Sequence, residues 1–206
     1  MRGLDIGCGE GVVQRQFTAM TAWQTDGCEL NRTALAKHSS TNGKVFYYDV
    51  SERRLELRER YDFAVLFDVV EHVDDAEAFL QSAAYHLKPG GYLFINVPAG
   101  QYLYSRYDTI LGHYRRYNRP LLREHVARAG LVILALRYWG WSMLPAALAR
   151  KFLVERKHDA DDIMRTGFNP PSRFASALLS MALATETLFP PAPFGTSIFA
   201  VARKPL

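Results

Sequence analysis

Residues 4–11 read LDIGCGEG, and this stretch decides the fold of the chain. A short apolar strand runs into a turn with glycine at every second position, and apolar residues at helical spacing follow from Val12 to Met20. Glycine tolerates positive φ and has no side chain, so a ligand can lie against the backbone there. The following helix directs free N–H groups and the positive end of its dipole at the turn. We predict a cofactor site at this turn, although an ordinary strand-to-helix turn would show the same glycines.

Composition and charge are those of an ordinary globular protein. The chain has 206 residues, of which 49% are hydrophobic and 22% charged, enough for one substantial core and unlike a disordered protein. The net charge of +4 permits an anionic partner but does not by itself indicate nucleic acid. Cys8 and Cys28 form no metal-ligand pattern, so we expect reduced thiols, no bound metal and a cytoplasmic location. Asp5 interrupts the N-terminal apolar residues before a signal peptide develops.

Strand and helix patterns alternate along the first two thirds of the chain. Apart from the first strand and helix, strands are predicted at 21–28, 44–48, 61–67, 92–97 and 131–136, and helices at 31–38, 75–87 and 120–129. The nearly continuous apolar run 61–67 suits a strand buried on both faces of a parallel sheet. We therefore predict a doubly wound α/β fold with a mostly parallel sheet. Ligands of such sheets bind outside the carboxyl ends of the strands.

Two acidic residues at predicted strand ends favour an adenosine-containing ligand. Glu29 ends the second strand and can accept hydrogen bonds from both hydroxyls of a ribose, while Asp49 ends the third and could meet an adenine amino group. Singly, each could equally be a solvated loop acid. Dinucleotide-binding turns follow the pattern G-x-G-x-x-G, with a pyrophosphate on the helix N-terminus. This turn instead carries Glu10 among its glycines, which would repel a pyrophosphate.

With these features the chain resembles the class I S-adenosylmethionine-dependent methyltransferases. Residues 4–11 look like motif I of that family, and VVEHV at 69–73 followed by LKPGG at 87–91 looks like the later motifs of its type 11 branch. The resemblance covers about residues 3 to 138. It implies a seven-stranded sheet whose last strand, here 196–202, is antiparallel. A helix that usually precedes motif I and helps cover the cofactor is missing from this sequence.

The resemblance also implies a set of cofactor contacts. Gly7, Gly9 and Gly11 would pack against the methionine part of S-adenosylmethionine, and Asp5 would hold its amino group directly or through water. Phe67 would offer its carbonyl group to that amino group, with Asp68 nearby. The full set expected to bind the cofactor is Asp5, Gly7, Cys8, Gly9, Gly11, Glu29, Leu30, Asp49, Val50, Phe67 and Asp68.

Methyl transfer from a sulfonium is an in-line displacement that needs a general base only where the acceptor arrives protonated. His72, at the end of the fourth strand, and His113 are the candidates. His72 could instead brace its loop through a hydrogen bond to Glu71 or to the backbone.

A second candidate region, residues 102–117, holds five tyrosines and three arginines. Its members Tyr107, His113, Arg115 and Arg116 are predicted to bind an acceptor with anionic or aromatic groups. Aromatic and polar packing over the sheet edge would give the same composition. Nucleic acid is disfavoured as the acceptor, because the fourth strand ends without the Asn/Asp-Pro-Pro-aromatic motif and strands four to six carry no cysteine.

Nearly sixty residues separate the sixth strand from the last one. We predict a single domain with its core at 1–138 and 194–206 and a helical insertion at about 139–193, made of one amphipathic helix and a second from Ser172 to Phe189. Neither is a credible membrane span. The insertion could be a lid over the acceptor, a partner or dimer surface, or an interfacial helix in peripheral contact with a membrane.

We thus expect an S-adenosylmethionine-dependent methyltransferase that acts on a small, partly apolar or anionic acceptor, more readily at oxygen than at nitrogen or carbon. Two alternatives remain open: a non-catalytic binder of the same cofactor, and an NAD-dependent oxidoreductase. The sequence indicates no oligomeric state.

Overall fold

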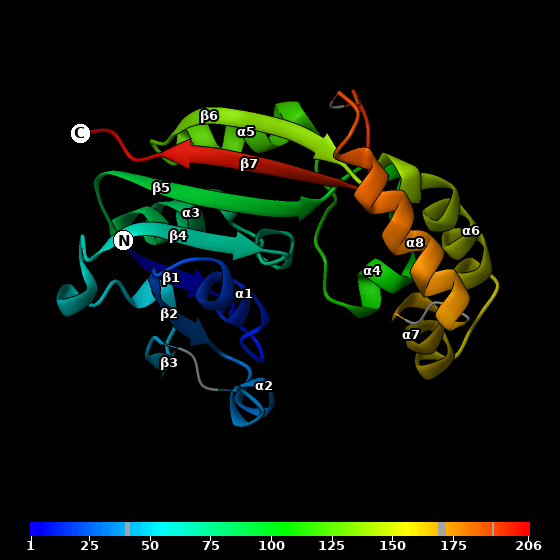
Figure 1. Ribbon diagram of the computed structural model, residues 1–206, viewed down its shortest axis with the longest axis horizontal. Coiled ribbons are helices and arrows are strands. Elements are labelled where there is room, and N and C mark those ends of the chain that lie inside the picture. Colours follow the sequence, from blue (N-terminus) through cyan, green and yellow to red (C-terminus); the bar gives the residue numbers. More distant parts are fainter. Residues whose placement is uncertain (40–41, 169–171, 191) are drawn as a thin grey trace.

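The computed structural model describes residues 1–39, 42–168, 172–190 and 192–206. Seven strands form one sheet in the order β3-β2-β1-β4-β5-β7-β6, in which β7 runs antiparallel to both of its neighbours (Figure 1). The strands are β1 Arg2–Ile6, β2 Gln24–Glu29, β3 Val45–Tyr47, β4 Tyr61–Phe67, β5 Leu87–Pro98, β6 Val132–Trp139 and β7 Ser197–Arg203. The predicted fold class is confirmed, including the antiparallel last strand.

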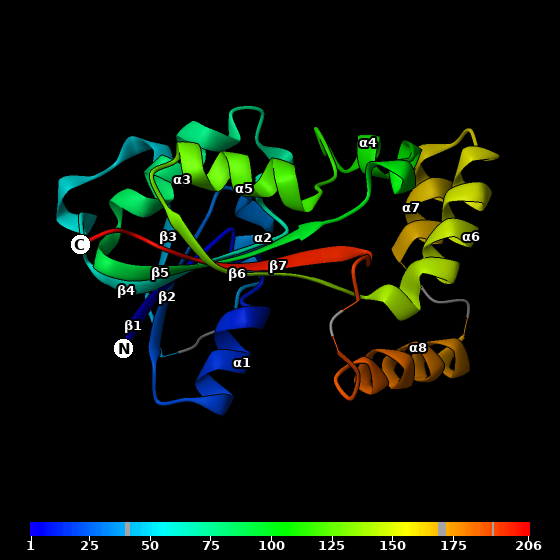
Figure 2. The ribbon, with the colours of Figure 1, turned by 90° about the horizontal axis from the view of Figure 1, so that it is seen from above.

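Helices cover both faces of this sheet. They are α1 Val12–Met20, α2 Arg32–Ala36, α3 Ala76–Tyr85, α4 Arg106–Ile110, α5 Arg119–Arg128, α6 Leu144–Glu155, α7 Ala160–Phe168 and α8 Arg173–Glu186. Seen from above, α3 and α5 lie on one face and α1 on the other, while α6 and α7 stand beyond the end of the sheet (Figure 2). Because the strand order reverses between β1 and β4, the loops after these two strands diverge and leave the place where such folds bind ligands.

The core lies mainly under the central strands. Phe63, Ala64, Val65 and Leu66 of β4 are fully buried, as the apolar run of this strand predicts. β1 pairs with it on one side and β5 on the other. The strand therefore forms a rigid support for the side chains that follow Phe67.

The end of α3 and the start of β5 differ from the predictions, because the bend that contains Gly90 lies inside the strand. The helix expected through Leu87 ends at Tyr85, and β5 begins at Leu87 although Lys88-Pro89-Gly90-Gly91 had indicated a stop. Leu87 pairs with Tyr61, after which the register shifts. Gly90 takes a positive φ of 75° at this irregularity. Glycine is the residue that allows such a bulge inside a pleated strand.

Between β6 and β7 the described residues form three α-helices where two helices were predicted. The sequence did not indicate α7. This helix has two acidic residues in its first turn, Asp161 and Asp162, and the carboxylate of the preceding Asp159 accepts a hydrogen bond from the Asp162 N–H. Its Ile163 is buried against Val154 of α6 and Tyr107 of α4. This small apolar cluster joins the insertion to the loop that follows β5.

Candidate functional site

The glycine turn after β1 has the backbone that a ligand-binding turn needs. Gly7, Gly9 and Gly11 have φ values of 75°, 52° and 82°, which L side chains rarely adopt. A Cβ atom on Gly7 would lie 2.7 Å from a methyl group of Val69, whereas the space beside Gly9 is open. The N–H groups of Gly7 and Cys8 both donate to the carbonyl oxygen of Cys28, which fixes the turn on the end of β2.

Two carboxyl groups flank this turn. Asp5 is 2% exposed and one of its carboxyl oxygens has no hydrogen-bond partner. Burial, together with the charge of Glu29, raises the pKa of Asp5 to about 7. Glu29 accepts hydrogen bonds from the N–H groups of Gly9, Leu30 and Asn31 at 2.9, 2.7 and 2.7 Å. A carboxylate offers about four acceptor positions, so three are filled and one remains for a ligand.

The other predicted cofactor residues lie around the same edge. Asp49 caps a short 3-10 turn by accepting a hydrogen bond from the Ser51 N–H at 2.8 Å, and Val50 in that turn is buried. Leu30 is exposed beside Glu29. Burial raises the pKa of the Cys8 thiol to about 12, so this residue is protonated and unreactive at neutral pH. The structure thus brings these residues to one edge of the sheet, and their contacts with a cofactor stay predictions.

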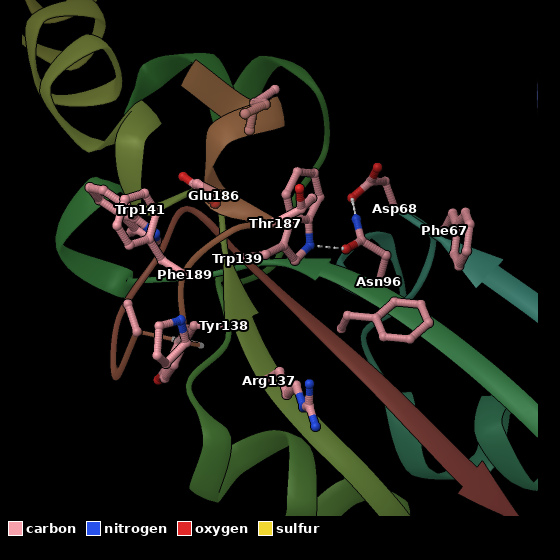
Figure 3. Close-up of a pocket in the computed structure, with 14 residues that line it drawn as sticks. Phe67, Asp68, Asn96, Arg137, Tyr138, Trp139, Trp141, Glu186, Thr187 and Phe189 are labelled. Carbon is pink, nitrogen blue, oxygen red and sulfur yellow. Dashed lines mark hydrogen bonds between the residues drawn. The ribbon is translucent and has the colours of Figure 1, made fainter. Parts of the chain in front are cut away.

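A polar bridge closes the carboxyl ends of β4, β5 and β6. Asp68 follows Phe67 with a positive φ of 55°, which is unusual for a residue other than glycine. Its carboxylate accepts a hydrogen bond from the Asn96 amide at 3.0 Å, and the Asn96 oxygen accepts one from the Trp139 indole at 2.8 Å (Figure 3). Asn96 and Trp139 were not among the predicted site residues, because only the folded sheet places them beside Asp68.

A cavity of about 780 Å³ lies on this bridge. Its walls are largely aromatic and apolar, and come from the strand ends, from the short turn after β6 and from α8. The principal lining residues are Phe67, Trp139, Trp141, Leu183, Phe189 and Phe199 (Figure 3). Glu186 holds α8 in place by accepting hydrogen bonds from the N–H groups of Gly140 and Ser142 at 2.8 and 2.5 Å. The cavity volume suits a small organic molecule.

Asp108, in α4, organises the loop that contains His113. Its two carboxylate oxygens accept hydrogen bonds from His113 Nδ1 at 3.0 Å, Arg116 Nε at 2.7 Å and the Ser105 N–H at 3.0 Å. Burial alone would raise the pKa of Asp108, but the bonds from His113 and Arg116 outweigh it and lower this pKa to about 2. The ionised carboxylate therefore favours the hydrogen on Nδ1, and in the neutral imidazole Nε2 of His113 is the acceptor. The spacing Ser105-x-x-Asp108, a capping box, is the sequence signal for α4 that was overlooked.

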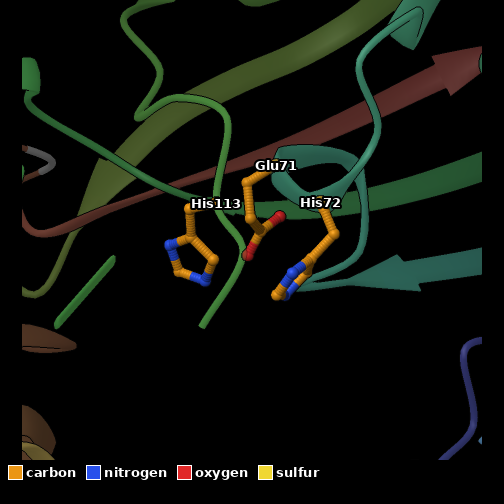
Figure 4. A group of neighbouring side chains, drawn as sticks. All are labelled: Glu71, His72 and His113. Carbon is orange, nitrogen blue, oxygen red and sulfur yellow. The ribbon is translucent and has the colours of Figure 1, made fainter. Parts of the chain in front are cut away.

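Both predicted catalytic histidines lie together with Glu71. The rings of His72 and His113 meet edge to face with their centroids 4.6 Å apart. One ligand atom from each histidine and from Glu71 lies within 4.8 Å of the other two (Figure 4). Burial and the neighbouring His113 lower the pKa of His72. The loop that carries His113 is tied to this region by the Tyr114 N–H, which donates to the Glu71 carbonyl oxygen at 2.8 Å.

The three remaining predicted acceptor residues make internal contacts. Arg116 is buried on Asp108, and Tyr107 packs in the cluster with Val154 and Ile163. Arg115 donates to the Asp74 carbonyl oxygen at 2.8 Å. None of these residues lines the aromatic cavity among the described parts of the chain. Their contacts with an acceptor stay predictions, and the geometry gives Arg116 a role in holding Asp108 and His113.

Comparison with known proteins identifies the family. A model of the family described as "Methyltransferase domain" matches residues 1–136, well over half of the 206-residue chain. The chain belongs to this family. Its relatives and structural neighbours include methyltransferases solved with S-adenosylmethionine and S-adenosylhomocysteine, and S-adenosylmethionine is the cofactor of the domain. The predicted resemblance to class I methyltransferases is confirmed.

Curated relatives match somewhat less than half of the chain. A ubiquinone biosynthesis O-methyltransferase of Bradyrhizobium sp. (strain ORS 278) is 37% identical over 100 residues, which cover 47% of this chain and 39% of the relative. One of Rhizobium leguminosarum bv. trifolii is 35% identical over 99 residues, 46% of this chain and 39% of the relative. The matched region thus spans about two fifths of the length of these relatives.

Solved structures share the fold over the whole chain. Phosphoethanolamine N-methyltransferase 2 of Haemonchus contortus, solved with S-adenosylmethionine, superposes with a TM-score of 0.64 at 21% identity, covering 100% of this chain and 49% of that one. A Bacillus halodurans protein described as a "putative methyltransferase" gives 0.65 at 14% identity, with coverage of 100% and 93%. At these identities the likeness concerns the fold alone.

Within the described residues, no helix has the length and apolar character needed to cross a membrane. The insertion nevertheless exposes large apolar side chains, among them Leu148, Phe152 and Leu153 of α6 and Met181 of α8. Peripheral contact of residues 139–190 with a membrane stays a prediction.

Proposed function

We propose that this chain transfers a methyl group from S-adenosylmethionine to a hydroxyl oxygen of a small acceptor with an apolar, ring-bearing part. One observation carries the proposal: the aromatic cavity of about 780 Å³ includes Asp68, the residue that follows β4 at the reversal of strand order. In this proposal Asp68 lies between the cofactor at the glycine turn and the acceptor in the cavity. The cytoplasmic location predicted from the two free thiols is part of the same proposal.

The residues around the glycine turn fit the proposed cofactor. The unpartnered oxygen of Asp5 is a buried acceptor without a donor, which the amino group of an aminoacyl moiety would satisfy. The open space beside Gly9 leaves room for the ligand against the backbone. When bound, S-adenosylmethionine supplies an electrophilic methyl group on a sulfonium.

The protein's own contribution is to desolvate and orient the acceptor. Trp139 and Trp141 offer flat apolar faces to a ring, and the hydrogen bond from Trp139 to Asn96 fixes one of these faces. Neither His72 nor His113 lines the described cavity, but His113 lies close enough to influence the Asp68 carboxyl group at its edge. Loss of the hydroxyl proton makes the acceptor oxygen nucleophilic, so we assign these two histidines to that step.

Oxygen as the methylated atom is supported by the curated relatives, whose names describe O-methyltransferases of ubiquinone biosynthesis. It also agrees with the histidine pair, since a hydroxyl must lose a proton during transfer. An aromatic ring that carries a hydroxyl and an apolar tail is the acceptor class that fits the cavity lining.

The test is formation of S-adenosylhomocysteine with a panel of phenols and catechols, with and without alkyl tails, and with amines of matched size. Turnover of the phenols but not the amines supports the proposal, and turnover of the amines alone contradicts it. Thermal shifts separate the alternatives, since a ligand at 100 times its dissociation constant adds about 2.7 kcal/mol. Stabilisation by NAD and not by S-adenosylhomocysteine would indicate an oxidoreductase. Stabilisation by S-adenosylhomocysteine without turnover of any acceptor would indicate a non-catalytic binder.

A further inference from the structure

Glu71, His72 and His113 form a cluster whose contacts leave it incomplete. Glu71 is 1% exposed, and its Oε2 atom has no hydrogen-bond partner in the described structure. An unpartnered buried carboxylate oxygen costs several kcal/mol unless a cation or a donor meets it, so it marks a place where something binds. Figure 4 shows this carboxyl group between the two imidazole rings.

Each of the two imidazoles has a nitrogen within 4.8 Å of the other and of the Glu71 carboxyl group. Asp108 accepts a hydrogen bond from His113 Nδ1, so in the neutral imidazole Nε2 carries the lone pair. A carboxylate behind a histidine in this way is the usual second contact of a metal-binding imidazole. The His72 ring lies beside the backbone of Leu111 and Gly112, on the loop that carries His113.

The charge around the cluster also favours a cation. The guanidinium of Arg116, which acts on Glu71, is paired with ionised Asp108 at 2.7 Å, so its charge is largely cancelled. Asp68 adds a further carboxyl group close enough to influence Glu71. The side chains that surround the cluster therefore supply more acceptors than donors.

We propose that Glu71, His72 and His113 bind a divalent first-row transition metal ion, and that this ion binds the acceptor hydroxyl during methyl transfer. Two imidazoles and one carboxylate form a ligand set typical of such ions, and three protein ligands leave positions open for substrate. The inference departs from the expectation of no metal, which rested on cysteine spacing. It rests on the proposed methyl transfer to a hydroxyl, and it assigns the two histidines to holding the ion in place of removing the hydroxyl proton directly.

The spacing of the ligand atoms fits an ion after a small adjustment. Atoms about 2.1 Å from a common ion lie roughly 3 to 4 Å apart, against the present separations of up to 4.8 Å. A shift of about one ångström by an imidazole, well within rotamer freedom, closes this difference.

The chemistry balances without an oxidant or reductant. The hydroxyl oxygen would bind the ion, which lowers the pKa of the hydroxyl, and its proton would pass to water. The oxygen lone pair would form the new bond to the methyl carbon as the bond from that carbon to sulfur breaks. The electrons of the broken bond stay on sulfur, which gives the neutral thioether of S-adenosylhomocysteine.

Binding of Co²⁺ to the full chain, stripped of metal by a chelator, tests the site independently of activity. Co²⁺ bound by two imidazoles and a carboxylate gives visible absorption bands, and calorimetry gives its affinity. We expect one Co²⁺ per chain, competed by Zn²⁺ and far more weakly by Mg²⁺, which prefers oxygen ligands. Glu71→Gln should weaken Co²⁺ binding more than a hundredfold, and Asp108→Asn about tenfold to a hundredfold.

Two controls keep the experiment decisive. His158→Gln removes an exposed histidine far along the chain and should leave Co²⁺ binding unchanged. Binding of S-adenosylhomocysteine by Glu71→Gln shows that the variant folds. No Co²⁺ bound by the folded protein, or equal affinity in Glu71→Gln, would overturn the inference. Methylation of a phenol at an unchanged rate by the metal-stripped protein would also overturn the metal proposal, but it would support the proposed function. Metal binding without methylation of any hydroxyl would count against the proposed function alone.

Discussion

Protonation of Asp5 should control the affinity for the cofactor below neutral pH. Burial and the charge of Glu29 raise the pKa of Asp5 to about 7, so near pH 7 about half of the free protein carries a neutral carboxyl group there. The amino group of S-adenosylhomocysteine is a cation below its pKa of about 8 and needs the carboxylate. The affinity should therefore be fully developed above pH 7 and should fall as pH drops through 7. If binding returns the pKa of Asp5 to its ordinary value, the loss between pH 7 and pH 6 is about fivefold, or about 1 kcal/mol.

Calorimetry with S-adenosylhomocysteine at pH 5.5, 6, 6.5 and 7 measures this dependence. In buffers of different ionisation enthalpy, about half a proton should be released on binding at pH 7. Asp5→Asn should bind more weakly at pH 7 and lose most of the pH dependence, because the amide does not titrate. An affinity of the native protein that is constant from pH 7 to pH 5.5, or an equal slope in Asp5→Asn, would refute the reasoning.

Three further perturbations probe the rest of the site. Gly7→Ala should lower the free energy of unfolding by about 1 to 3 kcal/mol more than Gly9→Ala, since only the first places a Cβ atom 2.7 Å from Val69; equal losses in denaturant titrations would argue against that contact. Glu186→Gln should destabilise the protein by about 1 to 3 kcal/mol and raise KM for apolar acceptors, because charged hydrogen bonds hold α8 beside the cavity. An unchanged KM would exclude α8 from acceptor binding. Asp108→Asn should lower kcat at least tenfold with little change in cofactor affinity, and a loss confined to that affinity would contradict its assignment.

The fold could be predicted because its signals are local. The glycine turn, the buried run of β4 and the alternation of strands and helices each follow from a few neighbouring residues, and Asn31 caps α2 as its type predicts. The bulge at Gly90 and the helix α7 were missed because pairing with Tyr61 and packing on Tyr107 decide them. Local propensity is overridden where such tertiary contacts are strong.

The site was only partly predictable for a related reason. Residues at strand ends can be placed by topology alone, which is why His72 was a candidate. Glu71 was considered only as a hydrogen-bond partner for His72, and Asp108 was not considered at all, because their importance depends on burial and on which atoms remain unpartnered. The aromatic content of residues 102–117 indicated acceptor binding, but the structure uses Tyr107 for packing and draws its aromatic cavity from Trp139, Trp141 and α8 instead.

The position of β7 has a consequence for how such a protein can diversify. This strand lies between β5 and β6 and pairs along its length with both. The long helical segment that precedes it therefore begins at the end of one strand and ends at the start of the neighbouring strand in the same sheet. A segment anchored in this manner can change in length and composition without disturbing the half of the protein that carries the glycine turn. Acceptor specificity can therefore change during evolution while the binding site for the methyl donor is retained.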